Sequence, residues 1–215
     1  MTADLSTEHP FRILVVCTGN ICRSPFAERL LRAALGRIAA ATGNPGWADV
    51  VEVASAGTAA MVGSPIEPAM LAHLAAHDAD ALRHAARQLE RAQVETADLV
   101  LGLSRSHRRA IVAMLPRAGR RTFALNEFAR LLDDAIASGA ARVDLAEDPR
   151  PVLETLVLAA GSRRGFALAP EDPSADDVPD PYGRAPEVYE SATTRIAQVV
   201  DRIEGAILAA AGVPR

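Results

Sequence analysis

The 215-residue chain has few cysteine and aromatic residues and no lysine. These shortages limit the classes of protein to which it can belong. The two cysteines stand five positions apart and form no disulfide framework, so we expect a reducing compartment. A membrane-spanning helix needs an uncharged apolar run of roughly 18 residues or more, and no run in this sequence approaches that length. The chain is therefore not expected to enter a membrane. Residues 1–12 lack the basic start and apolar run of a secretion signal, which predicts a cytoplasmic protein.

The charge balance argues against a dedicated nucleic-acid partner. All 23 basic residues are arginine, and 27 acidic residues give a net charge of −4. The absence of lysine is typical of GC-rich coding and favours a bacterial source. With 49% hydrophobic residues, the chain can bury one core, so we predict a single domain over residues 1–215. No metal-ligand spacing is visible, and we expect neither metal nor cofactor.

Strands alternate with helices along most of the chain. Residues 11–17 are a short β-branched apolar run typical of a buried strand, and a helix follows with Ser24 as its expected N-cap and Pro25 in its first turn. Such alternation predicts an α/β fold, a four-stranded parallel sheet with helices on both faces. Further strands are expected at 50–56, 98–103 and 121–125, and further helices at 68–77, 106–115 and 185–211.

One stretch, residues 129–177, departs from this alternation. It has ten acidic residues and five arginines, so it is the acidic part of the chain. We interpret it as an insertion with helical segments at 131–136 and 152–160 and a polar final part, 170–177, that is too polar to pack and should be mobile. Its position before residue 180 leaves three roles open: a lid, a docking element or a neutral insertion.

The segment 17–24, Cys-Thr-Gly-Asn-Ile-Cys-Arg-Ser, joins the first strand to the first helix, and we call it the 17–24 loop. Backbone N–H groups in such a turn and the helix dipole form an anion site. The predicted phosphate-binding residues are therefore Thr18, Gly19, Asn20, Ile21, Cys22, Arg23 and Ser24. Arg23 can hold two phosphate oxygens, and the same field favours a Cys17 thiolate that attacks phosphorus.

A phosphate ester also needs an acid that protonates its leaving oxygen. Asp180 is the candidate, because it stands in Asp-Pro-Tyr (180–182), where proline stiffens the chain and Tyr182 offers a flat face.

These motifs resemble the low-molecular-weight protein-tyrosine phosphatases over about residues 11–128 and 177–211. The resemblance rests on the 17–24 loop, Ser55-Ala-Gly57, His84-Ala-Ala-Arg87 and Asp180-Pro-Tyr182. It implies hydrolysis of protein phosphotyrosine, with Cys17 as nucleophile, Arg23 on the phosphate, Asp180 as general acid and then base, and Ser24 donating to the thiolate. Asn20, Ser55 and His84 would support the loop.

Residues 55–63 resemble the corresponding segment of phosphatases encoded in bacterial exopolysaccharide loci, whose partners are tyrosine autokinases. The resemblance implies such a kinase as a partner. Met61 would then form one wall of the substrate cleft, opposite Tyr182.

Arsenate reductases share the loop, but their thioredoxin-coupled branch needs more cysteines. Protein-arginine phosphatases have threonine at the position of Ile21, where an isoleucine suits a phenyl ring better. Both remain alternatives, as does a non-catalytic phosphotyrosine-binding module, which would lack the nucleophile or the acid.

Overall fold

The computed structural model describes residues 9–77, 79 and 83–211. Its centre is a four-stranded parallel sheet in the order β2-β1-β3-β4, which confirms the predicted fold class. The strands are β1 (Phe11–Cys17), β2 (Val51–Gly57), β3 (Leu99–Gly102) and β4 (Thr122–Ala124). β1 lies between β2 and β3, so its carboxyl end at Cys17 is flanked on both sides.

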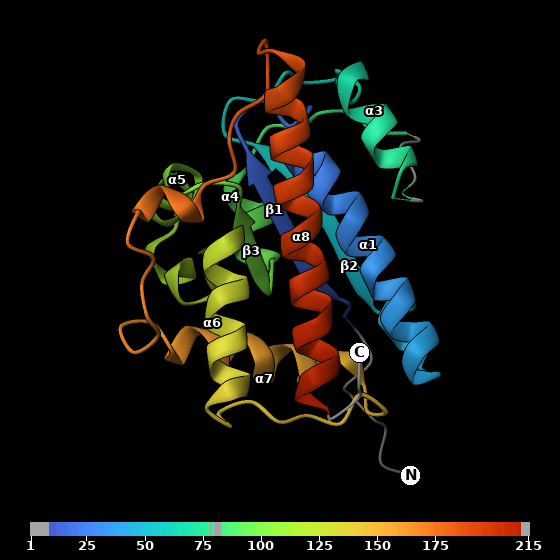
Figure 1. The fold of residues 1–215 in the computed structure, drawn as a ribbon, viewed down its shortest axis with the longest axis vertical. Helices are drawn as coiled ribbons and strands as arrows, with labels where there is room; N and C mark the ends of the chain where they lie inside the picture. The colour runs from blue at the N-terminus through green and yellow to red at the C-terminus, as the bar shows by residue number, and fades with distance from the viewer. Residues whose placement is uncertain (1–8, 78, 80–82, 212–215) are drawn as a thin grey trace.

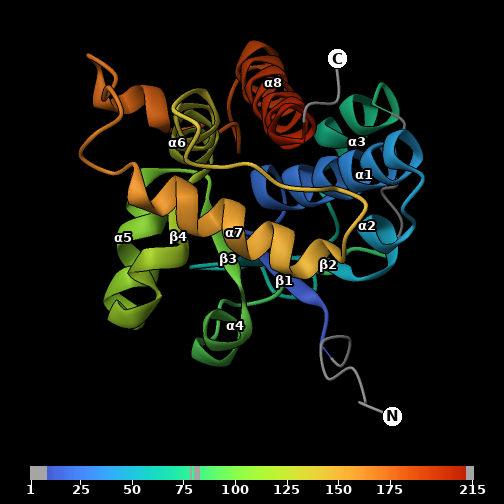
Figure 2. The ribbon, with the colours of Figure 1, turned by 90° about the horizontal axis from the view of Figure 1, so that it is seen from below.

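Helices cover both faces of the sheet (Figure 2). One face packs against α1 (Arg23–Thr42), α3 (Pro68–Ala75), α6 (Leu125–Ala137) and α8 (Pro186–Ala210). The other face packs against α4 (Arg91–Thr96), α5 (Arg105–Met114) and the 3₁₀ segment η2 (Pro116–Arg121). α2 (Gly46–Asp49) follows α1 and brings Trp47 into the first face's core.

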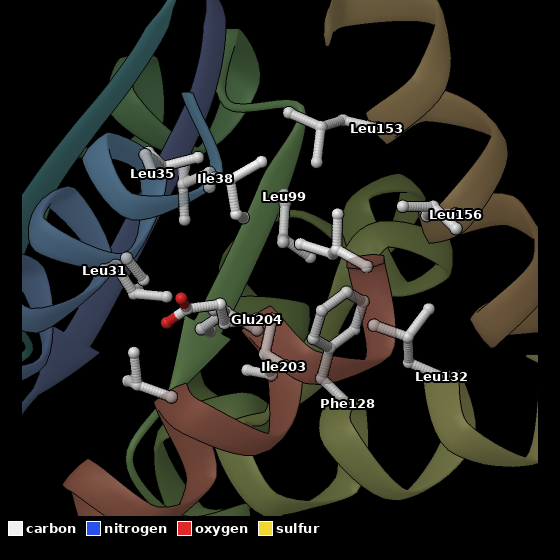
Figure 3. A pocket seen from close by; sticks show the side chains of 15 residues that line it. Leu31, Leu35, Ile38, Leu99, Phe128, Leu132, Leu153, Leu156, Ile203 and Glu204 are labelled. Carbon is white, nitrogen blue, oxygen red and sulfur yellow. The ribbon is translucent and has the colours of Figure 1, made fainter. Parts of the chain in front are cut away.

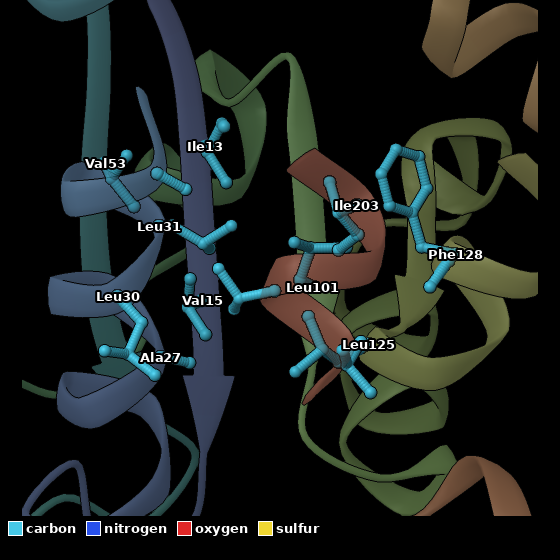
Figure 4. Packing of buried hydrophobic residues seen from close by; sticks show 14 of the residues in the cluster. Ile13, Val15, Ala27, Leu30, Leu31, Val53, Leu101, Leu125, Phe128 and Ile203 are labelled. Atoms are coloured by element: carbon cyan, nitrogen blue, oxygen red, sulfur yellow. The ribbon is translucent and has the colours of Figure 1, made fainter. Parts of the chain in front are cut away.

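The period-two pattern of β1 divides the core between these two faces. Ile13 and Val15 point toward α1 and α8, where Figure 4 shows them packed near Leu101 and Ile203. Leu14 and Val16 join the second cluster with α4 and α5. A strand buried on both faces needs a continuous apolar run, which is the pattern that residues 11–17 have.

One cavity lies inside this core. It holds about 30 Å³ and is lined by side chains of β1, β3, α1, α6, α7 and α8, with Glu204 as the polar group (Figure 3). That volume admits a water or two but no substrate, and no residue of the 17–24 loop lines it. We therefore assign it to packing.

Within the acidic insertion, α7 (Pro149–Ser162) lies at the amino ends of the strands, the end opposite Cys17 (Figure 1). Arg150 fixes it there: the guanidinium donates to the carbonyl of Pro10, just before β1, and pairs with Asp98, just before β3. α7 therefore does not cover the 17–24 loop, and the roles of lid, docking element or neutral insertion stay open for the insertion as a whole. The apolar residues of α7 are buried in the main core: Val152, Leu153, Leu156, Val157 and Ala160.

The strap, residues 163–177, returns from α7 along α6 toward the carboxyl ends of the strands. It forms a 3₁₀ turn, η3 (Pro173–Asp176), where the sequence predicted only loop. Ion pairs, rather than buried apolar side chains, attach the strap to the rest of the protein. Asp176 pairs with Arg130 at 3.3 Å, and Asp177 pairs with Arg105 at 3.2 Å. Its acidic residues are thus partly neutralised by neighbouring arginines, and its expected mobility stays a prediction.

Two further expectations need comment. Ser24 is not the N-cap of α1, because the helix begins at Arg23 with Cys22 in the N-cap position and Ser24 in its first turn. The expected absence of a secretion signal concerns residues 1–12, of which 1–8 lie outside the described part of the chain. Within the described residues, no helix is long and apolar enough to cross a membrane.

Candidate active site

The 17–24 loop lies at the carboxyl end of β1 and the start of α1, where parallel sheets with helices bind ligands. No side chain caps the first turn of α1, so its backbone N–H groups stay available to an anion. The loop packs directly onto the end of β2: a Cβ at Gly57 would lie 2.4 Å from the carbonyl oxygen of Thr18. Only glycine fits there, which explains its place in the Ser55-Ala-Gly57 motif.

Cys17 is 2% exposed, and its sulfur faces two polar groups of the same loop. The hydroxyl of Ser24 lies 3.0 Å from Sγ, and the backbone N–H of Asn20 donates to Sγ at 3.3 Å. The Ser24 hydroxyl therefore contacts Cys17 Sγ and does not cap the helix.

Asn20 holds the loop in shape from inside. Its φ of 55° is in the left-handed region, which asparagine tolerates better than most residues. Its side-chain amide donates to Ser24 and Ser55, both at 2.9 Å, and its Oδ1 accepts from the N–H of Arg87 at 2.9 Å. The carbonyl of Asn20 accepts from His84 Nε2 at 2.7 Å.

A second layer stands behind this network. Ser55 donates to Glu28 at 2.6 Å, and Arg87 Nε donates to the carbonyl of Ser55 at 2.8 Å. Burial lowers the pKa of His84, although its bond to Asn20 and the charge of Glu28 oppose that shift. The structure thus brings the predicted supporting residues Ser55 and His84 onto Asn20, and it adds Glu28 and Arg87, whose roles the sequence analysis did not predict.

Arg23 and Asp180 meet across the mouth of the loop although 157 positions separate them. The guanidinium of Arg23 donates to Asp180 Oδ2 at 2.5 Å and to the carbonyl of Val178 at 3.1 Å. Arg23 is almost fully buried, whereas about half of the Asp180 side chain is exposed. The N–H of Val178 donates to the carbonyl of Leu103, just after β3, so the end of the sheet helps to position Asp180.

Met61 and Tyr182, the predicted walls of the substrate cleft, are both exposed, and each is hydrogen-bonded through its backbone N–H to a residue of the candidate site. Met61 is 42% exposed, and its N–H donates to the carbonyl of Gly19 at 3.0 Å. Tyr182 is 52% exposed, and its N–H donates to Asp180 Oδ1 at 3.3 Å. Val62, at 71% exposed, adds apolar surface beside Met61 that the sequence analysis had not singled out.

His107 is a residue of the site that the sequence analysis missed. It is 5% exposed in α5, with Nε2 3.0 Å from Thr18 Oγ1 and Nδ1 2.8 Å from Ser104 Oγ. Burial, assisted by the charge of Arg23, lowers its pKa to about 4. A neutral imidazole therefore links the start of α5 to the 17–24 loop. A lone histidine in an arginine-rich helix gave no signal of this contact.

Cys22 is a buried residue of the 17–24 loop, and among the described residues it belongs to no metal-binding cluster. Burial raises the pKa of Cys22 to about 12, with the charge of Cys17 as the next cause. Cys22 is therefore a thiol at neutral pH. Across the residues that the structure describes, no group of three or more His, Cys, Asp or Glu side chains is arranged to hold a metal ion.

Comparisons with known proteins agree with this geometry. The family model "Low molecular weight phosphotyrosine protein phosphatase" matches residues 12–137. A probable low-molecular-weight protein-tyrosine-phosphatase, EpsP of Ralstonia solanacearum, is 41% identical over 123 residues, which is 57% of this chain and 76% of that protein. A protein-arginine-phosphatase of Geobacillus stearothermophilus is 35% identical over 149 residues, 69% of this chain and 92% of that protein.

A solved low-molecular-weight protein tyrosine phosphatase from T. tengcongensis aligns with a TM-score of 0.60 at 27% identity, over 90% of this chain and 97% of the other. The structural match extends beyond residue 137 and takes in much of the carboxyl-terminal part, whereas the family model stops there. By sequence and by fold, this chain belongs to the low-molecular-weight phosphotyrosine protein phosphatase family.

Proposed function

We propose that the protein hydrolyses phosphotyrosine in proteins through a cysteinyl-phosphate intermediate. The observation that carries the proposal is the convergence of Arg23 and Asp180, 2.5 Å apart, at the mouth of the loop that holds Cys17. A nucleophile, an anion-binding arginine and an exposed carboxyl group at one helix start are the parts that phosphate-ester hydrolysis requires. The tyrosine-phosphatase relatives support the same substrate class.

In the first step, the phosphate group lies in the 17–24 loop against backbone N–H groups and Arg23. Cys17 Sγ forms a bond to phosphorus as the bond from phosphorus to the tyrosine oxygen breaks. Asp180 gives its proton to the departing oxygen, so the leaving group is a neutral phenol. The contacts of Sγ with Ser24 and Asn20 keep the thiolate in place.

In the second step, water attacks the phosphorus of the cysteinyl-phosphate. Asp180, now a carboxylate, accepts a proton from that water, the S–P bond breaks, and inorganic phosphate and the Cys17 thiolate are released. Val178 is attached to Leu103 and to Arg23, which supports Asp180 beside the 17–24 loop in both steps.

Phosphotyrosine is favoured over phosphoarginine by the character of the cleft. Met61 and Tyr182 offer apolar and aromatic surface that an aryl ring can contact, and Ile21 has no hydroxyl for a guanidinium. The arginine-phosphatase relative keeps phosphoarginine as the second candidate substrate. A bacterial tyrosine autokinase is the proposed partner, on the resemblance of residues 55–63 to the phosphatases of exopolysaccharide loci, and the cytoplasm is the proposed location. We treat residues 1–215 as one phosphatase domain with an insertion at about 129–177.

The test compares phosphotyrosine and phosphoarginine peptides in the wild type, Cys17→Ser, Asp180→Asn and, as a control, Asp172→Asn, which changes an exposed carboxylate of the strap. Cys17→Ser should abolish turnover and still bind phosphate. Asp180→Asn should lower kcat for the phosphotyrosine peptide roughly 10²- to 10⁴-fold, and Asp172→Asn should leave it unchanged.

Two results would overturn the proposal. Near-full activity of Asp180→Asn on the phosphotyrosine peptide would assign the leaving-group proton to another residue. A higher kcat/KM for phosphoarginine than for phosphotyrosine in the wild type would replace the substrate.

A further inference from the structure

The first turn of α5 packs closely against the end of β3. A Cβ at Gly102 would lie 2.9 Å from the backbone nitrogen of Arg108 and 3.0 Å from the Cβ of His107, so glycine is needed for this close approach. Ser104 caps the helix, because its hydroxyl accepts from the N–H of His107. The packing and the cap fix this turn to the sheet, and we call residues 103–107 the α5 start.

The α5 start contacts the 17–24 loop through His107. Its Nε2 lies 3.0 Å from Thr18 Oγ1 and its Nδ1 lies 2.8 Å from Ser104 Oγ, so the imidazole has a partner at both nitrogens. Thr18 directly follows Cys17 in the chain. The buried imidazole therefore holds the residue next to Cys17 at a defined place relative to α5.

Asp177 attaches the loop of Asp180 to the same helix start. Its Oδ1 accepts from the backbone N–H of Arg105 at 2.6 Å, and its Oδ2 lies 3.2 Å from Arg105 Nη2. The helix dipole also favours a carboxylate at this end of α5. The next residue, Val178, donates from its N–H to the carbonyl of Leu103 at 2.9 Å. Two consecutive residues just before Asp180 are thus bonded to the α5 start.

The bond from Asp177 to the backbone N–H is the attachment that fixes position. The side chains of the ion pair are partly exposed, 43% for Arg105 and 29% for Asp177, so water and salt weaken their attraction. A backbone donor has no rotamers to search, and a carboxylate strengthens the hydrogen bond that it accepts. Loss of this bond should therefore release the acid loop more than loss of the charge alone.

We propose that Asp177 and His107 are positioning residues that act through the α5 start to hold Asp180 at the correct distance from a phosphate group in the 17–24 loop. Asp177 fixes the loop of the acid, His107 fixes the loop of Cys17, and one helix turn joins the two. Proton transfer needs hydrogen-bond distance, so a displacement of about 1 Å between the loops can lower the rate roughly 10²-fold. The proposal rests on the phosphatase function proposed above, in which Asp180 is the general acid.

The experiment compares kcat/KM for phenyl phosphate and para-nitrophenyl phosphate, because phenol is the poorer leaving group and depends more on the proton from the acid. Asp177→Ala should lower kcat/KM for phenyl phosphate about tenfold or more, and less for para-nitrophenyl phosphate. Asp177→Asn keeps an oxygen that can accept from the N–H of Arg105, so it should stay closer to the wild type. Asp176→Asn is the matched control: it removes the neighbouring carboxylate, which pairs with Arg130, and should leave both values unchanged.

His107→Asn tests the second attachment. An asparagine amide can reach Ser104 but is too short for Thr18, so this variant should change the ratio of the two kcat/KM values in the same direction as Asp177→Ala. In the double variant the change should be smaller than the product of the single changes, because both act on one distance. Both substrates are measured on one preparation, so partial misfolding lowers both values alike and leaves their ratio unchanged.

Several results would overturn the proposal. Equal fold-losses on the two substrates in Asp177→Ala would remove the positioning role of Asp177, and equal effects of Asp177→Ala and Asp177→Asn would assign the loss to charge. An unchanged ratio in His107→Asn would remove the role of His107. Asp180→Asn is measured alongside: if it leaves the ratio unchanged, the proposed function fails and this proposal with it. If it changes the ratio and Asp177→Ala does not, the positioning alone is wrong.

Discussion

At the residue scale, Asn20 shows how one side chain can determine the shape of a site. Its amide and its carbonyl reach Ser24, Ser55, Arg87 and His84, which come from α1, β2 and the segment after α3. Each of these groups is buried or partly buried, and an unsatisfied polar group there costs about 1–3 kcal/mol. The left-handed backbone of Asn20 is thus stabilised by bonds that a smaller residue would not make.

His107 leads to a prediction about stability and pH. Its pKa is about 4 in the folded protein, against an ordinary value of 6.5 that the unfolded chain retains. Between these two values the unfolded chain binds a proton that the folded chain does not, so stability falls as the pH is lowered through this window. The contribution amounts to roughly 1.4 kcal/mol per pH unit.

Urea unfolding of the wild type and His107→Gln at several pH values between 7 and 4 measures this effect. The wild type should lose more stability than the variant as the pH falls, so that the difference between them shrinks. His9→Gln, which changes an exposed histidine, should follow the wild type. If the curves of the wild type and His107→Gln stay parallel, the titration of His107 is not coupled to folding.

Cys22 leads to a prediction about oxidation. Because its thiol is protonated at neutral pH, Cys17 should react first with peroxide and form a sulfenic acid. That step removes the thiolate charge that helps to raise the pKa of Cys22. The Cys22 sulfur then forms a disulfide with Cys17 and water leaves, at a rate that rises with pH.

Mass spectrometry after mild peroxide should detect the Cys17–Cys22 disulfide, and a thiol reductant should restore activity. Cys22→Ser should instead accumulate sulfinic acid on Cys17 and lose activity irreversibly. Sulfinic acid on Cys17 as the sole product in the wild type would contradict the pairing.

At the scale of elements, the sequence predicted that α7 is a helix but not where in the fold it packs. Its apolar positions recur at helical spacing, which predicted a helix with a buried face. The same spacing fits a face that packs on the sheet, on α6 or on a partner, so the periodicity could not assign its place. The contacts of Arg150 with residues before β1 and β3 decide it, and they join residues far apart in the sequence.

The position of α7 gives a prediction about stability. Leu156 is buried among the core residues, whereas Leu158 on the same helix is 71% exposed. Leu156→Ala should lower the free energy of unfolding by about 2–5 kcal/mol because it leaves a cavity, and Leu158→Ala should change it by less than about 0.5 kcal/mol.

Denaturant unfolding measures both variants, and kcat for a small aryl phosphate should stay near the wild-type value in each. Equal stabilities of the two variants would show that α7 is not part of the core. A selective loss of kcat in Leu156→Ala would show instead that α7 acts on the active site.

Other elements were predictable to different degrees. β1 was predicted from its continuous apolar run, and α1 and α8 from long apolar periodicities, although the Ser24-Pro25 signal placed the start of α1 slightly too late. α2 and α4 were missed, since helices of four and six residues have no period to detect. The 17–24 loop was predictable because its residues are contiguous. Glu28, Arg87 and His107 were not, because their roles depend on contacts between distant segments.

At the scale of the whole molecule, the sheet order explains why the site can exist. β1 is central, so the 17–24 loop at its end is surrounded by the ends of β2 and β3 and by the segments that follow them. Ser55, His84, His107 and Asp180 reach one loop from four parts of the chain. The alternation of strands and helices predicts this edge as the site, and the tertiary contacts supply its details.

The separation of Arg23 and Asp180 by 157 positions has a consequence during synthesis of the chain. The ribosome produces Cys17, Arg23 and all four strands well before it produces Asp180. A nascent chain that ends near residue 137 therefore lacks both Asp180 and the core side chains of α7 and α8. The bonds of Arg23 to Val178 and Asp180 can form only after those later residues have been synthesised, so this part of the 17–24 loop's surroundings is completed last.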